Sequence, residues 1–366
     1  AFFTGVVLGY FFTIIVILQK YAGYSEFTIG IVASCFSFGL MSAGFIVTKV
    51  LNKIGLFLTL IFAVSLQTVC IISMFAYFNP INLAICHFVM GLMGGMNWMT
   101  MDAWANIVSS DKNRGKAIGL YNSSISIGFG VGPLIVALYG SSGNLPVIIC
   151  LILMSLRILT IILIKKHIHE VKIPSQNNKI NFSFVLFAPF IFIAIFVAGV
   201  NDSSFGALFP AFMINEFFSD KQIGFLFFVG LCIGVFLQPL VGALTDKINK
   251  RFLILVFLIF HIVWPLLLNN FITEITIVYI VVIIWGVASI SLYTVTLAYL
   301  GERVKITELS IATSVFIIIF EFGEFVGPIT IGFIMDKYEN IGFIYSILSF
   351  AFISLFIGII RSIIKR

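Results

Sequence analysis

The stretch Gly242-Ala-Leu-Thr-Asp246-Lys247-Ile-Asn-Lys250-Arg251 is a short charged turn between two long apolar runs. A glycine, an acid four residues later and then several bases are typical of a tight cytoplasmic hairpin between two membrane helices. A degraded copy of this turn, Thr48-Lys49-Val-Leu-Asn52-Lys53-Ile-Gly55, lies about half a chain earlier, also between two apolar runs. The two turns predict a membrane bundle that is duplicated along the chain.

The composition excludes a water-soluble globular protein. Hydrophobic residues make up 61% of the chain, charged residues only 10%, and the mean hydropathy is +1.17. Soluble domains carry about 25% charged residues, so lipid must cover much of this surface. The cysteines lie singly inside apolar runs without C-x-x-C spacing, and we interpret them as small buried hydrophobic residues rather than a metal or disulfide set: Cys35, Cys70, Cys86, Cys150 and Cys232.

Twelve apolar runs follow one another along the chain, and in lipid only helices or closed barrels satisfy the backbone. Runs of this length exclude barrel strands. We therefore predict an all-α integral membrane protein with six helices in residues 1–164, a cytoplasmic linker at 165–182 and six helices in 183–366. The runs fall at about 1–18, 27–48, 56–78, 82–107, 115–139, 146–164, 183–214, 223–245, 252–271, 275–302, 308–335 and 342–361.

Lys and Arg gather at one end of the predicted bundle. The opposite end carries only Lys20, Lys221 and Lys337. By the positive-inside rule, both termini and the linker should lie in the cytoplasm of a bacterial inner-membrane protein. The net charge of +6 is then a topology signal and argues against a nucleic-acid partner. The basic end holds Lys49, Lys53, Lys112, Arg114, Lys116, Lys165, Lys166, Lys172, Lys179, Lys247, Lys250, Arg251, Arg303, Lys305, Arg361, Lys365 and Arg366.

Three segments of the first half recur in the second at one offset, within one residue. We expect each serine in the first pair to cap the helix that follows, with Gln222 completing a capping box. The repeat predicts two six-helix bundles related by a pseudo-twofold axis along the membrane normal. The pairs are Ser25-Glu26…Ile29-Gly30 with Ser219-Asp220…Ile223-Gly224, Asn52-Lys53 with Asp246-Lys247, and Gly128-x-x-x-Gly132-Pro133 with Gly323-x-x-x-Gly327-Pro328.

The second hairpin, from Gly242 to Arg251, resembles the G-x-x-x-D-R-x-G-R-R signature of the major facilitator superfamily, with Asn249 at the second glycine. In the first hairpin Thr48 and Asn52 replace the glycine and the acid, while Lys53 and Gly55 remain. The resemblance covers essentially the whole chain. It implies alternating access around a central cavity lined mainly by the first, fourth, seventh and tenth helices, and it assigns a gating role to the hairpin residues Gly242, Asp246, Lys247, Arg251 and Lys53.

A narrower set of segments resembles the YcaD-like branch of bacterial facilitators. This set comprises Trp104 with Asp102 near it, Arg114-Gly115-Lys116, Leu292-Tyr293-Thr, Gly301-Glu302-Arg303 and Gly327-Pro328. Tyr293 of this set is a further substrate-binding candidate. The resemblance does not identify the substrate.

Charged side chains inside apolar runs cost about 2.5–3.5 kcal/mol on insertion scales, so each needs a reason. Glu321 and Glu324 lie one turn apart on one face of the eleventh run. Two carboxylates this close should not both ionise in a low dielectric. We predict that they form a proton-coupling site, the alternative being a permanently protonated pair that only bonds a neighbouring helix.

Asp202 belongs to Val200-Asn201-Asp202-Ser203-Ser204, a polar break in the seventh run. We predict that Asp202 and Asn201 bind substrate or protons, because polar breaks in such helices face ligands. The alternative is a structural role. Asn97 and Trp98 in the fourth run are further substrate-binding candidates.

Four other charged residues are predicted to lie toward the cytoplasmic side of the membrane. Asp102 is predicted to pair with Arg114 or Lys116 as a gate, the alternative being a substrate contact. Glu302 and Arg303 would form the corresponding gate of the second half beside Asp246 and Arg251. Arg157 is expected to snorkel toward the cytoplasmic headgroups, with a place inside the bundle as the alternative.

Two glycine-containing motifs have both a packing and a functional interpretation. Met90, Met93, Met96 and Met99 recur every third residue between glycines, which favours close helix packing over an adaptable ligand wall. The Gly-Pro motifs resemble one found in antiporters, but their presence in both halves favours a packing and bending role.

The sequence contains no G-x-S-x-G, P-loop or Rossmann motif and no cluster of metal ligands, so we predict neither an enzyme nor a cofactor or metal. We predict a monomeric, proton-coupled secondary transporter that moves a small organic solute. We expect its cavity to prefer protons, cations or neutral amphipaths, because acids outnumber bases in the membrane. The alternatives are a uniporter, or a sensor of the same fold that no longer transports, which the missing acid at Asn52 keeps open.

Overall fold

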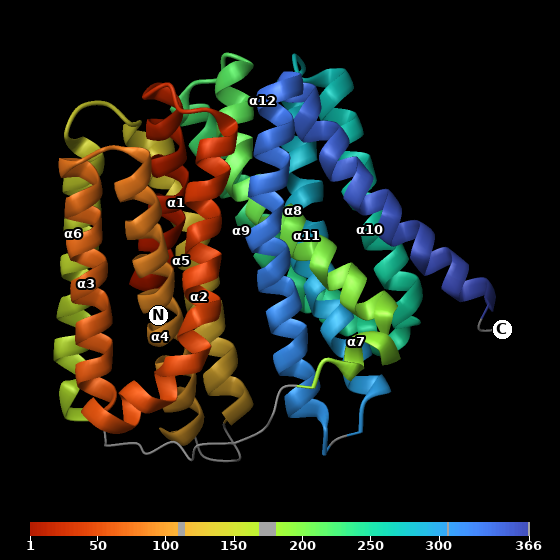
Figure 1. The fold of residues 1–366 in the computed structure, drawn as a ribbon, viewed down its shortest axis with the longest axis horizontal. Coiled ribbons are helices and arrows are strands. Elements are labelled where there is room, and N and C mark those ends of the chain that lie inside the picture. Colours follow the sequence, from red (N-terminus) through yellow and green to blue (C-terminus); the bar gives the residue numbers. More distant parts are fainter. Residues whose placement is uncertain (109–113, 168–180, 306, 365–366) are drawn as a thin grey trace.

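The computed structural model describes residues 1–108, 114–167, 181–305 and 307–364, and its regular elements are helices (Figure 1). Six long helices make up the first half, and four long helices and one very long one make up the second. They are α1 (Phe2–Tyr21), α2 (Glu26–Ile54), α3 (Leu56–Ala76), α4 (Pro80–Val108), α5 (Arg114–Tyr139), α6 (Leu145–Ile164), η1 (Lys165–His167), α7 (Ser183–Phe187), α8 (Pro189–Asn215), α9 (Asp220–Lys247), α10 (Lys250–Phe271), α11 (Ile275–Arg303) and α12 (Leu309–Ile364).

The long element α12 contains two passes. Glu339 has φ 55° and ψ −147°, which no helix accommodates, so the chain turns there and runs back. With α1–α6 and α8–α11, these two passes complete the twelve helices predicted from the apolar runs. Ten of the helices, α12 counted once, are long and apolar enough to cross a membrane within the described ranges.

One predicted helix is divided. The run at 183–214 forms the short α7 and the long α8, separated at Ala188, which has φ −129° and ψ 54°. Ala188 precedes Pro189, and the proline ring disfavours the helical conformation in the residue before it. The bounds predicted for the linker stay a prediction, since residues 168–180 lie outside the described part of the chain.

Equivalent helices pack in the same order in the two halves, as the repeat predicts. In the first half α1 packs against α5, α2 against α4 and α3 against α6. In the second half α8 packs against α12, α9 against α11 and α10 against α12. The caps agree as well: Ser25 accepts a hydrogen bond from the Thr28 amide, and Ser219 and Gln222 form a capping box.

The glycines of the two Gly-x-x-x-Gly-Pro motifs lie against helix backbone. A Cβ at Gly128 or Gly132 would overlap backbone atoms of α1, and one at Gly323 or Gly327 would overlap backbone or Ser204 atoms of α8. The motif therefore permits close helix contact, and the packing interpretation is confirmed. The methionine stripe has the same role, because Met90, Met93 and Met96 are buried in the apolar core of the first half.

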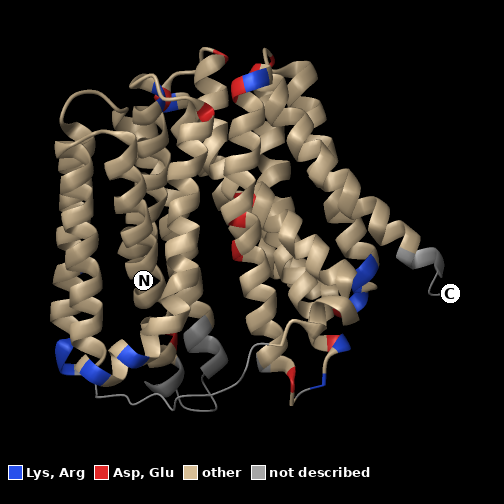
Figure 2. Ribbon diagram, in the orientation of Figure 1, with Lys and Arg blue, Asp and Glu red and all other residues tan. Residues whose placement is uncertain are grey.

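The charged residues lie mainly at the two ends of the bundle (Figure 2). Lys and Arg gather at the lower end, where the hairpins after α2, α9 and α11 lie, whereas Lys20, Lys221 and Lys337 belong to the opposite end. Most of the chain between these ends is uncharged, as lipid exposure requires. The red segments in the middle of Figure 2 are the exception, and they belong to the site described next.

Candidate functional site

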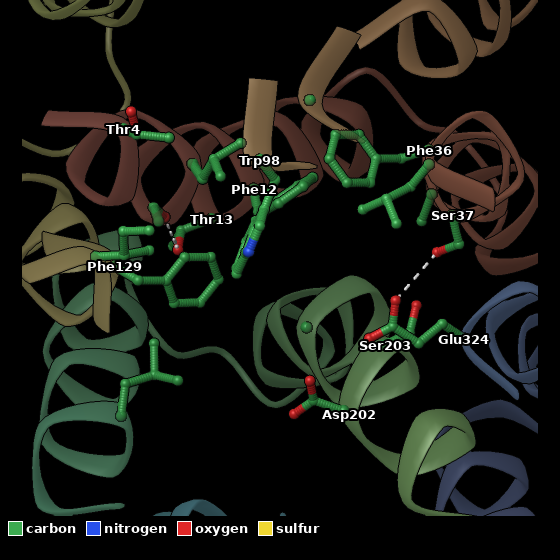
Figure 3. Close-up of a pocket in the computed structure, with 18 of the residues that line it drawn as sticks. Thr4, Phe12, Thr13, Phe36, Ser37, Trp98, Phe129, Asp202, Ser203 and Glu324 are labelled. Atoms are coloured by element: carbon green, nitrogen blue, oxygen red, sulfur yellow. Dashed lines mark hydrogen bonds between the residues drawn. The ribbon is translucent and has the colours of Figure 1, made fainter. Parts of the chain in front are cut away.

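A cavity of about 440 Å³ lies between the two halves. The four helices expected from the family resemblance, here α1, α4, α8 and α11, all contribute to its lining, and so do α2, α3, α5, α6, α9 and α12. Its walls are largely apolar, and the first half contributes the aromatic side chains of Phe12, Phe36, Trp98 and Phe129 (Figure 3). The Phe12 and Phe36 rings meet edge to face, with their centroids 4.8 Å apart.

Three carboxyl groups face this cavity from the second half, and we call them the acidic cluster: Asp202 on α8, with Glu321 and Glu324 on α12. The Glu321 and Glu324 side chains hydrogen-bond to one another, and Asp202 interacts electrostatically with both. A hydrogen bond between two carboxyl groups needs a proton on one of them. The cluster therefore has the composition of a site that holds a proton.

The acidic cluster also contacts the first half. Ser37 Oγ on α2 donates a hydrogen bond of 3.5 Å to Glu324 Oε2, as the dashed line in Figure 3 shows. Glu321 is 9% exposed, and its Oε2 atom has no hydrogen-bond partner among the described residues. The cluster thus combines one contact across the two halves with one buried carboxyl oxygen that has no hydrogen-bond partner among the described residues.

Arg157 does not snorkel, so that expectation is wrong. Its side chain is 3% exposed and lines the cavity, and its Nη1 atom donates a 2.7 Å hydrogen bond to Gln67 Oε1. The reason is the position of Arg157 on α6, where it shares one buried face with Cys150, Met154 and Ile161. This face packs toward α1 and α3, which carries the guanidinium into the bundle.

The first half also contributes uncharged polar groups to the cavity that were not predicted. Gln67 and His87 are almost fully buried, with Gln67 Nε2 bonded to Met90 O at 3.0 Å and His87 Nδ1 lying 2.8 Å from Leu83 O. Tyr121 lines the cavity and forms a hydrogen bond with Asp102. Polar residues inside apolar runs were the available signal for Gln67 and His87.

Not all of the residues predicted to bind substrate in the fourth and seventh runs lie in the cavity lining. Asn97 and Trp98 line the cavity, and Trp98 points into it in Figure 3. Asn201 does not line it, because the next position along a helix faces about 100° away from Asp202. Its side chain is fully buried and donates to Val197 O at 3.0 Å.

Tyr293 lies behind the acidic cluster instead of in the cavity lining. Its ring packs edge to face against Phe316 and Phe320, with centroids 5.3 and 5.1 Å apart. It interacts electrostatically with Glu321 and Glu324. Tyr293 is therefore placed to position the two glutamates, and a direct substrate contact would need it to move.

The second hairpin encloses a separate hollow at the lower end of the bundle. Lys250 Nζ lies 2.6 Å from Glu302 Oε1 and donates to Thr245 O at 2.8 Å, so Lys250 rather than Arg251 pairs with Glu302. Arg251 lies over the Phe190 ring at 5.9 Å. The hollow is lined by residues that include Asp246, Lys247, Lys250, Arg251, Glu302 and Arg303.

For the other predicted gating residues, the structure shows where each one lies but does not show a complete gate. A Cβ at Gly242 would meet no atom within 4 Å, so close packing does not explain this glycine. Lys53 lies in the last turn of α2. Asp102 bonds to Tyr121, and the side chain of Arg114 falls outside the described residues, so an Asp102–Arg114 pair stays a prediction.

The two halves are joined at the end opposite the linker by polar contacts that we call the outer network. The Ser141 amide and Oγ both donate to Asp220, at 2.8 and 2.5 Å. The Phe27 amide donates to Asp336 at 3.2 Å. The side chain of Asn215 donates to Glu26 at 3.0 Å, and Glu26 also pairs with Lys20. These bonds hold the α2–α12, α5–α9 and α2–α8 contacts closed at that end.

Comparisons with known proteins agree with this architecture. A point mutant of the nucleoside transporter NupG superposes with a TM-score of 0.80 at 12% identity, covering 98% of this chain and 96% of that one. A bacterial homolog to the human lysosomal transporter Spinster, in an inward-facing and occupied conformation, gives a TM-score of 0.77 at 13% identity, covering 98% and 94%. At such identities the likeness shows the fold alone.

The sequence comparisons establish the family. The uncharacterized MFS-type transporter YfkF of Bacillus subtilis (strain 168) is 23% identical over 279 residues, which is 73% of this chain and 70% of that protein. The narrower resemblance to the YcaD-like branch stays a prediction. The family model of the Major Facilitator Superfamily matches residues 1–190 and 191–365, nearly the whole chain. The chain therefore belongs to the Major Facilitator Superfamily and is a multi-pass membrane transporter, not an enzyme.

Proposed function

We propose that this transporter is proton-coupled and moves a small organic solute by alternating access between its two halves. The observation that supports this most is the acidic cluster, which lies in the cavity between the halves and shares a hydrogen bond with Ser37 of the first half. Because the proton-holding carboxyl pair also bonds to the first half, a change in its protonation would change the contact between the two halves.

The coupling follows from electrostatics. When the glutamate pair loses its proton, three carboxylates would face one another in a site of low dielectric, and their repulsion is large there. Water or a cationic group would have to reach the cluster to relieve that repulsion, which favours opening of the cavity. Reprotonation would remove the repulsion and favour closure. Proton uptake and release would thus bias the equilibrium between the two conformations.

The location and assembly belong to the same proposal. The end rich in Lys and Arg would face the cytoplasm of a bacterial inner membrane, and both termini and the linker would lie on that side. The transporter would work as a monomer, since the cavity is built from the two halves of one chain.

The test is a proton-flux measurement in liposomes. Purified protein is reconstituted around a pH-sensitive dye, and a panel of organic cations, anions, sugars and amino acids is added outside. A solute-dependent pH change should appear in the wild type and be lost in Glu321→Gln. The matched control is Glu274→Gln, which makes the same chemical change at an exposed position outside the cavity.

Two outcomes would overturn proton coupling. Tracer uptake without any pH change would establish a uniporter. Solute binding without uptake would establish a sensor of the same fold. In either case the acidic cluster would have a structural role, and Glu321→Gln should leave solute binding unchanged.

A further inference from the structure

We propose that the first half of the cavity holds an anion-binding subsite centred on Arg157, and that the transported solute carries one carboxylate, sulfonate or phosphate group on an apolar body. This inference rests on the proposed transport function and names the class of solute. It begins from the guanidinium, which lines the cavity at 3% exposure.

Arg157 is held in place but not neutralised. Gln67 Nε2 donates to Met90 O, which turns the Gln67 carbonyl oxygen toward Arg157 Nη1 at 2.7 Å. That oxygen accepts one of the five N–H groups of the guanidinium. The Nε atom has no hydrogen-bond partner among the described residues. A buried charge with free donors is costly unless a counter-ion completes it.

The described residues offer no acid as that counter-ion. Ion pairs within the described part of the chain join Lys20 to Glu26 and Lys250 to Glu302, and Arg157 belongs to neither. The Glu321 and Glu324 carboxyl groups interact with each other and with Asp202, and none of these three acids interacts with Arg157, whose electrostatic partner is the Tyr121 side chain. An anionic ligand group would supply the missing charge, and a guanidinium fork binds such groups in a bidentate manner.

The walls of the cavity define the remainder of the ligand. Phe12, Phe36, Trp98 and Phe129 line the first half of the cavity and face the side that carries Asp202 and Glu324 (Figure 3). A volume of about 440 Å³ lies within the range of ordinary small-molecule pockets. An apolar or aromatic body fits these walls, with its charged end at Arg157.

The acidic cluster limits the ligand to one anionic end. A second negative group near Asp202, Glu321 or Glu324 would be repelled whenever any of the three is ionised. The placement of Arg157 also changes the preference for cations that was expected because acids outnumber bases in the membrane, since it brings a buried cation into the cavity lining. The subsite therefore favours amphipathic monoanions over polyanions and over organic cations.

The experiment measures binding of three probes that share one body: 3-phenylpropionate, 3-phenylpropanamide and 3-phenylpropylamine. Isothermal titration of the purified full chain in detergent should show the anion binding at least about tenfold more tightly than the amide or the amine, as expected for a charge-assisted bidentate contact. Arg157→Gln should remove this difference, and Lys337→Gln, a charge removed at the opposite end of the bundle, should preserve it.

Arg157→Gln fails as a test if that variant does not fold, so Gln67→Glu provides a second one. It places a carboxylate of almost the same shape beside Nη1, which neutralises Arg157 from within and should abolish anion preference while amide binding stays unchanged. Three results would overturn the inference: equal binding of anion and amide, tighter binding of the amine, or no binding of any probe by folded protein.

The inference and the proposed function fail in different ways. Anion binding that depends on Arg157, with no proton flux in liposomes, would leave the subsite standing and refute proton coupling. Proton flux driven as well by the amide as by the propionate would leave coupling standing and refute the subsite.

Discussion

The two halves of the cavity are built from the same positions and differ in chemistry. Gly199 of α8 lies against the backbone of Phe320 and Glu324, as Gly5 of α1 lies against that of Ile125 and Phe129. In this register Glu324 corresponds to Phe129, Glu321 to Ser126 and Asp202 to Leu8, and all six line the cavity. The repeat therefore fixes which positions face the ligand, and substitution within one half makes that half acidic.

This comparison distinguishes residues that the fold requires from residues that the function requires. The glycine contacts are shared, so they belong to the packing of the first and fifth helix of each half. At these positions only the second half carries carboxyl groups, so the chemistry of the cavity-lining residues differs between the two halves. A change that makes the halves alike should remove function and keep the fold, whereas a change at the shared glycines should damage the fold itself.

The largest expected effect comes from Glu324→Phe, which gives the second half the residue found at Phe129. Removing Glu324 should abolish solute-driven proton flux, because Glu321 loses its hydrogen-bonding partner and the cluster loses its bond to Ser37 of the first half. Flux in dye-loaded liposomes is the measurement. Phe129→Leu is the control, since it changes the equivalent position without changing charge, and flux that survives in Glu324→Phe would contradict the prediction.

The next effect is on stability. Gly199→Ala places a Cβ against the Phe320 carbonyl oxygen, so the two helices must separate. Overpacking of this kind costs about 1–3 kcal/mol. Thermal unfolding in detergent should show a lower midpoint than in Gly206→Ala, since a Cβ at Gly206 meets no atom within 4 Å. Equal midpoints would mean that the α8–α12 contact adjusts freely.

A smaller effect is expected from Ser37→Ala, which removes the hydrogen bond that joins the first half to the acidic cluster. At 3.5 Å this bond is long, and we expect a loss of about 0.5–1.5 kcal/mol at most. The pH dependence of flux should shift by a few tenths of a unit while the maximal rate is retained. Ser42→Ala, on an exposed part of α2, serves as the control.

The smallest effect concerns the two hairpins. Lys250→Met removes the pair with Glu302, whose carboxylate is largely exposed, and exposed pairs contribute about 0–1 kcal/mol. The thermal midpoint should change little. A large fall would show that the second hairpin, unlike its degraded copy at Lys53, is part of the folded core.

Much of the fold was predictable because its signals are local. Apolar runs, the hairpins and the serine caps at Ser25 and Ser219 depend on neighbouring residues, and the structure confirms them. The break before Pro189 was a local signal as well, although the apolar run concealed it. Length and composition dominate helix formation in lipid, so a sequence shows its membrane helices plainly.

The site was less predictable because it depends on which faces meet. Asp202 and the glutamate pair were identified separately, but their meeting requires the glycine contacts between α8 and α12, which periodicity does not show. Arg157 was expected to reach the cytoplasmic headgroups, because long basic side chains inside apolar runs can snorkel to the membrane surface. Arg157 shares one helix face with Cys150, Met154 and Ile161. The sequence alone does not show that this face is buried, because that depends on which helices pack against it.

The outer network has a consequence for the conformational equilibrium of the transporter. Four hydrogen bonds cross between the halves there, from Ser141, Phe27 and Asn215, within the described residues. At about 0.5–1.5 kcal/mol net for each bond, together they favour the closed outer end by roughly 2–6 kcal/mol. Under the proposed proton-coupled alternating access, solute and proton would have to offset this difference in every cycle, because a ligand shifts an equilibrium only by its differential affinity. Under that proposal, weakening the network would shift the equilibrium toward opening of the outer end.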